Sequence, residues 1–329
     1  PEDAPARWDL DRHPAQPAVP WPDVYKRFAS DVRRIDDCVG DLLQLLKDLR
    51  IDDNTLVVFT SDNGPSRESY LKEDYEPNFF NSFGPHDGIK RDLWEAGIRV
   101  GAMVRWPGHI PAGKISRQPS AFWDWMPTFA ELAGIPAPAR TDGVSLVPSL
   151  LGKSAPQPPS RLYFEYFEGG KTPAYDEFAP AHRGRDRKQM QAIRIGDYIG
   201  VRYKIVAPSE LFEIYNILAD PQETNNLANL PGMAVLQREM QDTVLRVRRP
   251  DAQAKRPYDQ ELVPAVEARV MVPGIEWRTY RQPVPWVAKL DDAKPSTRRV
   301  GSAFTAGEPP GTRVSGVIFL GSLEAPDGG

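Results

Sequence analysis

The chain has 329 residues, of which 40% are hydrophobic and 26% charged, so it can bury a sizeable core and has room for two or more domains. Its formal net charge of −4 comes from 41 basic and 45 acidic side chains that are mixed along the sequence. It lacks the basic patch that is typical of nucleic-acid binding, and no apolar run approaches the roughly 18 residues of a membrane span. We therefore expect neither nucleic acid nor a membrane interior as a partner.

Cysteine and proline usage limit the possible disulfides and metal sites and indicate where the chain divides into parts. The single cysteine, Cys38, excludes an internal disulfide and any cysteine-rich zinc site. The chain begins at Pro1, and its first residues do not have the charged and apolar regions of a signal peptide. Prolines are abundant and gather near the ends and between Pro156 and Pro159, which indicates linkers between compact parts.

The first predicted element is a long amphipathic helix. It begins at Asp23 and carries apolar residues at close to helical spacing as far as Leu49. Residues 55–60 then form an apolar, β-branched run bounded by polar residues, which is typical of a buried parallel strand. A helix followed by such a strand indicates an α/β sheet.

Two oxygen-bearing side chains, Asp62 and Asn63, follow that strand directly. Ligands gather at the carboxyl ends of strands in open α/β sheets, and a carboxylate beside an amide suits a hard cation such as calcium or magnesium. Two ligands do not complete such a site, and an Asp-Asn-Gly turn also ends a strand without any metal. The residues by themselves leave both interpretations open.

A charged segment follows at residues 90–99. A lysine beside a cation site can pair with a tetrahedral anion, so Lys90 is a candidate ligand for such a group, with Asp92 or Glu95 holding it in place. A charged stretch at the edge of a strand is also typical of a solvated face. The Asp62–Asn63 turn and the segment at 90–99 together carry more information about a possible site than either one alone.

The later elements suggest three parts. Strands are expected at 99–106, 162–167, 191–195, 198–206, 211–215, 274–280 and 314–320. Helices are expected over 122–134, ended by Gly134, and over 232–248. We expect residues 1–156 to be part of an α/β core and residues 157–250 to be a smaller α+β subdomain. Residues 251–329 are expected to be a linker and a truncated β module, because so few strands cannot bury a core.

Several segments, in their order and spacing, resemble the downstream half of sulfatases of the arylsulfatase type. The segments are NTLVVFTSDNG at 54–64, FFNSFGP at 79–85, KRDLWEAGIR at 90–99 after Gly88, WPG at 106–108, and the stretches 123–134, 142–152 and 211–227. This resemblance implies an alkaline-phosphatase-like α/β fold with a partial parallel sheet. It also implies hydrolysis of sulfate esters and one bound calcium ion.

In that family the nucleophile is a formylglycine, made from a cysteine or serine in a C/S-x-P-x-R motif near the amino end. This sequence has no such motif, and Cys38 lies on the predicted helix, so we expect it to be a packed helix cysteine. We therefore expect a carboxyl-terminal fragment of a sulfatase that is inactive as given, with the formylglycine in a missing upstream segment. The resemblance also implies a periplasmic or secreted location.

The resemblance assigns roles to a few residues. Asp62 and Asn63 match two of the family's calcium ligands, and the other two belong to an upstream strand. Lys90 matches the lysine that contacts the sulfate oxygens and neutralises charge on the leaving oxygen, a catalytic and substrate-binding role. His86 and Asp87 replace the usual leucine and arginine, which favours an effect on substrate choice, with His86 contacting a sugar hydroxyl. The histidines that match no family position are His13, His86, His109 and His182, and a lone histidine in a loop is more often at the surface than catalytic.

The family resemblance also bears on the substrate and on two alternative functions. The tail from Val272 is similar to the opening of a PA14-like β-sandwich, which favours a sulfated carbohydrate over an aryl sulfate as the substrate. One alternative is a phosphatase or phosphonate hydrolase of the same superfamily, and another is a non-catalytic pseudoenzyme or carbohydrate-binding protein. The spacing from Asp62 to Lys90, with Glu95 following, favours the sulfatase, because many phosphatase relatives hold two metals with additional histidines.

Overall fold

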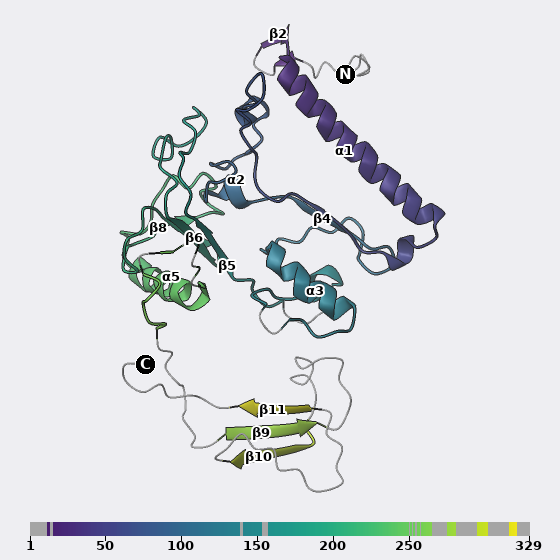
Figure 1. Ribbon diagram of the computed structural model, residues 1–329, viewed down its shortest axis with the longest axis vertical. Coiled ribbons are helices and arrows are strands. Elements are labelled where there is room, and N and C mark those ends of the chain that lie inside the picture. Colours follow the sequence, from purple (N-terminus) through teal and green to yellow (C-terminus); the bar gives the residue numbers. More distant parts are fainter. Residues whose placement is uncertain are drawn as a thin grey trace. The chain divides into compact units, whose positions relative to one another are not determined.

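The structure is a computed structural model of the chain (Figure 1). It describes residues 12–13, 16–138, 141–152, 157–249, 251, 253, 255–256, 258–264, 275–280, 295–301 and 316–320. The chain divides into two compact units, the first made of Pro1–Lys114 with Leu162–Val263 and the second of Ile115–Arg161 with Pro264–Gly329. The division into parts at residues 156 and 250 stays a prediction.

The first unit begins with a short hairpin and the predicted long helix. The hairpin strands are β1 (Arg12–His13) and β2 (Gln16–Pro20), and the helix is α1 (Asp23–Asp48). Asp23 in its first turn and Lys47 in its last complement the helix dipole. No residue of α1 is buried, and Cys38 is exposed, so the expectation of a packed cysteine is wrong. An amphipathic pattern predicts a face that can pack, but no described segment covers α1 at Cys38.

Strand β3 (Val57–Thr60) follows the single-turn helix η2 (Asp52–Asn54), and it pairs with β4 (Ala102–Arg105). The pairing is antiparallel, with Val58 opposite Val104, and both strands are half-buried or exposed. The expectation of a buried parallel strand is therefore wrong for the pairing that the structure describes. An apolar run predicts that a strand can be covered on both faces, but it carries no information on the direction of its neighbour.

Two short helical turns lie between β3 and β4 in the sequence. They are η3 (Pro77–Phe80) and α2 (Glu95–Ile98), and α2 belongs to the charged segment that carries Lys90. An aromatic cluster joins η3 to the start of α1, with the rings of Tyr25 and Phe79 stacked at 3.7 Å between centroids. Among the described residues, no helix is long and apolar enough to cross a bilayer.

A four-stranded antiparallel sheet forms the core of the first unit, and the four strands predicted there are confirmed. In spatial order they are β5 (Leu162–Tyr166), β6 (Met190–Ile195), β7 (Tyr198–Arg202) and β8 (Glu213–Asn216). Ala192 of β6 lies opposite Phe164 on one side and Val201 on the other. The connection from β5 to β6 is long, residues 167–189.

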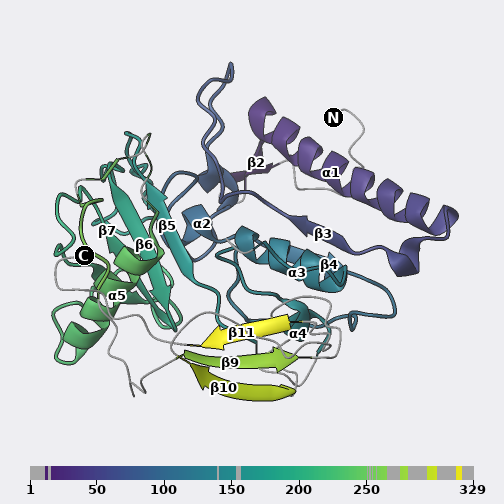
Figure 2. The same cartoon turned by 60° about the horizontal axis from the view of Figure 1, so that its bottom comes forward.

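Helix α5 (Met233–Val247), the helix predicted over residues 232–248, covers one face of this sheet (Figure 2). Ile193 and Ile214 point to this face and pack with Met240 and Val244. Gly200 allows the close approach, because a Cβ built there would lie only 2.5 Å from Met240 Sδ. The strand alternation that directs Ile193 to α5 directs its neighbours to the opposite face.

The opposite face of the sheet holds the segment around α2. Met190, Ala192 and Val201 pack there against Leu93 and Trp94 in one buried cluster. Trp94 is completely buried. The sheet therefore fixes the residues that follow Lys90, and this packing positions the candidate site.

The second unit contains helices and a separate sheet. Its helical elements are η4 (Phe122–Asp124), α3 (Trp125–Leu132) and α4 (Val147–Leu150), and its strands are β9 (Ile275–Tyr280), β10 (Thr297–Gly301) and β11 (Gly316–Leu320). Buried Asp124 accepts backbone hydrogen bonds from Ala121 and Val144 at 2.8 and 2.9 Å, which joins η4 to the chain before α4. The strands pair antiparallel in the order β10-β9-β11. The sequence did not predict β10, because its residues TRRVG are largely polar.

Candidate active site

The turn that carries Asp62 and Asn63 follows β3 directly. Asn63 donates a hydrogen bond from Nδ2 to Asp62 Oδ1 at 2.8 Å, and Ser61 Oγ donates to the Asn63 carbonyl at 3.0 Å. Asp62 is exposed and Asn63 is half-buried. The hydrogen bond between the two side chains fixes the turn and leaves the second Asp62 oxygen and the Asn63 amide oxygen to accept from, or bind, something else.

This turn lies against the segment that carries Lys90. Gly64 N donates to the Gly97 carbonyl at 3.1 Å, and Lys90 N donates to the Pro65 carbonyl at 2.7 Å. A Cβ on Gly64 would lie 1.7 Å from the Ala96 carbonyl oxygen, so only glycine allows the two backbones to approach this closely. The structure thus brings the Asp62–Asn63 turn and the Lys90 backbone together through direct main-chain contacts.

The acids near Lys90 do not pair with it. Asp92 forms an ion pair with Arg187 at 2.6 Å, and Glu95 pairs with Arg99. The expectation that Asp92 or Glu95 holds Lys90 is therefore wrong, since each is engaged by an arginine. Lys90 is half-buried, and within the part of the chain that the structure describes its ammonium forms no ion pair. Its charge is available to an anion.

Asp92 is instead a buried anchor. Arg187 binds it in bidentate fashion, from Nε to Oδ1 at 2.6 Å and from Nη2 to Oδ2 at 3.0 Å. Thr172 Oγ1 donates to Oδ1 at 2.7 Å, and the backbone N–H of Ile89 donates to Oδ2 at 2.9 Å. The Asp92 side chain is fully buried, so these four bonds replace the water that the carboxylate would otherwise bind.

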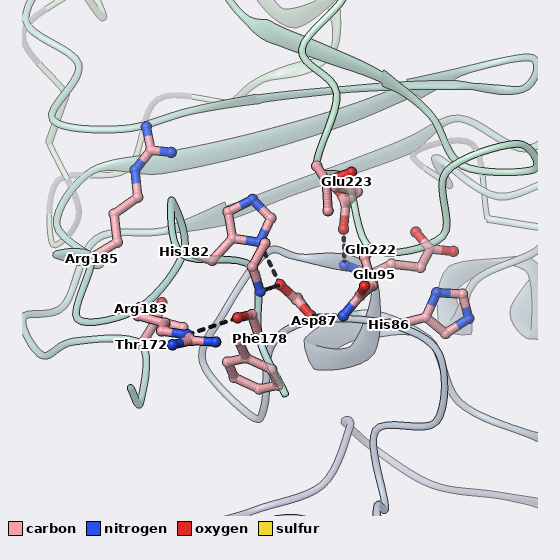
Figure 3. A network of polar contacts seen from close by, with 12 residues as sticks. His86, Asp87, Glu95, Thr172, Phe178, His182, Arg183, Arg185, Gln222 and Glu223 are labelled. Atoms are coloured by element: carbon pink, nitrogen blue, oxygen red, sulfur yellow. Dashed lines mark hydrogen bonds and ion pairs between the residues drawn. The ribbon is translucent and has the colours of Figure 1, made fainter. Parts of the chain in front are cut away.

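Asp87 is a second buried anchor on the same segment (Figure 3). Its Oδ2 accepts from His182 Nδ1 and from the backbone N–H of Ala179, each at 2.7 Å, and its Oδ1 accepts from Gln222 Nε2 at 3.1 Å. Asp87 therefore points into the protein, and its effect on substrate choice stays a prediction.

His182 was expected at the surface, and this expectation is wrong. Its side chain is 1% exposed, and its ring stacks on Trp94 with 3.7 Å between centroids. The sequence gives no local sign of this, because Asp87 and Trp94 lie far from His182 along the chain. By contrast, His109 is exposed as expected and stacks on Trp106, while the side chain of His13 lies outside the described residues.

Glu223 supports α2 from the turn after β8. Its Oε2 accepts from the backbone N–H of Glu95 at 2.8 Å, and its other oxygen is buried without a partner among the described residues (Figure 3). Burial raises the pKa of Glu223 well above its ordinary value, and the nearby carboxylates of Glu95, Asp87 and Asp220 raise it further. Burial without a second hydrogen bond favours the protonated form.

Replacing Glu223 by glutamine is expected to weaken the pH dependence of stability. The unfolded carboxyl loses its proton near 4.5 while the folded one keeps it, so wild-type stability falls as pH rises above that value, by at most about 1.4 kcal/mol per pH unit. The amide stays neutral and can still accept from Glu95, so the variant should gain stability relative to wild type as pH rises. Urea unfolding at several pH values measures this, with exposed Glu177→Gln as the control. Equal pH slopes in wild type and Glu223→Gln would contradict it.

An open surface cavity of about 480 Å³ is lined by residues next to His86. His86 Nδ1 lies 2.8 Å from the Pro221 carbonyl, and its neighbour Pro85 and partner Pro221 both line the cavity. Two acidic side chains, Glu177 and Asp220, also line it. The cavity offers carboxylate and carbonyl acceptors beside an imidazole, which suits a ligand with several hydroxyl groups.

The residues present fit a calcium ion in type but not in number. Asp62 and Asn63 offer hard oxygen donors, which calcium prefers, but it takes about six to eight of them. No group of three or more histidine, cysteine, aspartate or glutamate side chains is placed to hold a metal in the described ranges. The turn can therefore supply two ligands of a site.

Residues 3–135 match the Sulfatase family, and residues 83–250 match the family described as N-sulphoglucosamine sulphohydrolase, C-terminal. The second match alone spans more than half of the chain. The chain belongs to the sulfatase family, whose members adopt the alkaline-phosphatase-like α/β fold. The family and fold class predicted from the sequence are confirmed.

Individual relatives match a shorter stretch of the chain than the family models do. The N-acetylgalactosamine-6-sulfatase of Canis lupus familiaris is 43% identical over 128 residues, which are 38% of this chain and 23% of that protein. The steryl-sulfatase of Homo sapiens is 40% identical over 129 residues, 39% of this chain and 22% of that protein. The chain thus matches less than a quarter of the length of either relative.

Solved structures are also similar. One, a complex with its substrate D-glucosamine-2-N,6-O-disulfate, is 27% identical with a TM-score of 0.47, covering 65% of this chain and 38% of that chain. The phosphonate monoester hydrolase of Agrobacterium radiobacter is 21% identical with a TM-score of 0.42, covering 65% and 39%.

Proposed function

We propose that this chain contributes the Lys90 side of an active site that hydrolyses sulfate esters. The observation that carries the proposal is the main-chain contact between the Asp62–Asn63 turn and Lys90, whose ammonium forms no ion pair in the described part of the chain. A cationic side chain held beside a turn that can supply oxygen ligands to a cation is suited to the anionic sulfate group of an ester. Membership of the sulfatase family and the two relatives named as sulfatases support the same reading.

Each residue has a role in this proposal. Lys90 binds sulfate oxygens and stabilises the negative charge that grows on the leaving oxygen as the ester bond breaks. Asp62 and Asn63 hold one calcium ion together with ligands from elsewhere, and the bound ion would neutralise charge on the sulfate group. A formylglycine, which the family resemblance implies, has no matching motif in these 329 residues.

We propose a sulfated carbohydrate as the substrate class. The cavity beside His86 supports this, because the carboxylates of Glu177 and Asp220 can accept hydrogen bonds from hydroxyl groups and would repel a second sulfate. A sugar ring with free hydroxyls fits such acceptors better than a sterol or a simple aryl group. The name of the relative N-acetylgalactosamine-6-sulfatase supports an amino-sugar sulfate in particular. Action on such material outside the cytoplasm, in the periplasm or after secretion, belongs to the same proposal.

The test is sulfate release by the protein expressed from its complete reading frame. The substrates are monosulfated amino sugars, a sterol sulfate, an aryl sulfate and an aryl phosphonate, each with and without a calcium chelator. We expect the highest kcat/KM on a sulfated sugar, and a fall on calcium removal that added calcium reverses. Preference for the phosphonate would overturn the proposed reaction, and preference for the sterol or aryl sulfate would overturn the substrate class.

A further inference from the structure

We propose that residues 172–187, here called the clamp segment, position Lys90 by forming hydrogen bonds and an ion pair with the two buried carboxylates that flank it. Asp87 lies three residues before Lys90 and Asp92 two residues after it. Both belong to the loop that ends in α2, and both side chains are fully buried. The inference rests on the proposed function insofar as Lys90 is the sulfate-binding lysine.

The clamp segment contacts both anchors at once. At Asp87 it supplies the His182 ring and the backbone N–H of Ala179, each 2.7 Å from Oδ2 (Figure 3). At Asp92 it supplies Thr172 Oγ1 at 2.7 Å and the bidentate Arg187. Lys90 lies between Asp87 and Asp92 in the sequence, and its own N–H donates to the Pro65 carbonyl at 2.7 Å. Its main chain is thus held at three places while its side chain stays half-buried.

The clamp segment is itself held in place, so it can act as a fixed support. Arg183 Nε donates to the Phe178 carbonyl at 2.8 Å, and Thr172 N donates to the Arg185 carbonyl at 2.9 Å. The Phe178 ring packs edge-on against Phe83, with 4.8 Å between centroids. These contacts close the segment on itself and against the loop that precedes Asp87.

Stability alone does not account for this arrangement. Taking two carboxylates out of water within six residues is costly, and well-packed apolar side chains of similar volume often stabilise a core as well or better. The gain from paired buried charges is a defined geometry, because each bond restricts direction as well as distance. A lysine that must meet a sulfate group benefits from such placement, since misplacement by about 1 Å can cost on the order of 100-fold in rate.

The test replaces Asp87 by asparagine, with Asp176→Asn as the matched control. Both are carboxylates of this region, but the Asp176 side chain is fully exposed. In the full 329-residue chain we expect the Lys90 amide of Asp87→Asn to exchange its hydrogen faster, while amides of β6 and β7 exchange as in wild type. In the protein from the complete reading frame we expect kcat to fall about tenfold or more with KM nearly unchanged.

Each outcome decides a different point. Unchanged Lys90 exchange and kcat in Asp87→Asn, or equal changes in Asp176→Asn, would overturn the clamp. If exchange rises throughout β6 and β7, Thr172→Val replaces Asp87→Asn, because it removes one bond to Asp92 and leaves Arg187 in place. A wild-type protein that releases no sulfate would overturn the proposed function, while Lys90 exchange would still decide whether the clamp exists.

Discussion

Replacing Lys90 by alanine is expected to lower kcat for a sulfated sugar by about 100- to 1,000-fold in the protein from the complete reading frame. This is the usual cost of removing one group that stabilises charge developing in a transition state. Lys90 is placed for such a role because its backbone is bonded beside the Asp62–Asn63 turn, while no ion pair occupies its ammonium among the described residues. Sulfate release at saturating substrate measures the effect.

Two comparisons make this result specific. Lys90→Arg keeps the charge but replaces a compact ammonium with a planar guanidinium, so we expect it to recover only part of the lost rate. Exposed Lys114→Ala removes the same charge elsewhere in the first unit and should leave kcat near wild type. A Lys90→Ala variant that loses only substrate affinity, with kcat intact, would show that Lys90 binds the sulfate equally well before and during the reaction.

Much of the fold could be predicted because its signals are local. Alternating runs predicted β5 to β8, and helical spacing predicted α1 and α5 to within a few residues. The direction and burial of β3 were mispredicted, because they depend on which strand lies beside it, and the apolar run at residues 55–60 does not specify that. The exposed Cys38 is a similar case, since packing of a helix face depends on a distant partner.

The site shows the same limit at the level of side chains. The family resemblance selected Asp62, Asn63 and Lys90, and in the structure Gly64 and Pro65, which follow Asn63, form main-chain hydrogen bonds with the segment that carries Lys90. It did not select His182, whose partner Asp87 lies 95 residues away along the chain. Spacing along one chain does not indicate such a contact, because the residues next to His182 in the sequence do not include its partner.

The second large effect is expected at the ion pair between Arg187 and the buried carboxylate of Asp92. Arg187→Met is expected to destabilise the first unit by about 3–5 kcal/mol, because it leaves the buried Asp92 carboxylate without its bidentate partner. The Arg187 and Asp92 side chains are 8% and 0% exposed, so water cannot replace the lost contacts. Hydrogen exchange at the amides of β6 and β7 measures the free energy of unfolding of this unit.

The matched control is Lys204→Met, which breaks an ion pair with Asp186 of the same 2.6 Å length. Its side chains are 64% and 40% exposed, so water replaces the lost contact and we expect far less destabilisation than for Arg187→Met. Adding Asp92→Asn to Arg187→Met should restore part of the stability, because the amide carries no charge, its oxygen can still accept from the Ile89 N–H, and its NH2 group can donate to the Thr172 hydroxyl. A double variant less stable than Arg187→Met alone would contradict this account, since the uncompensated charge would then not be the source of the loss.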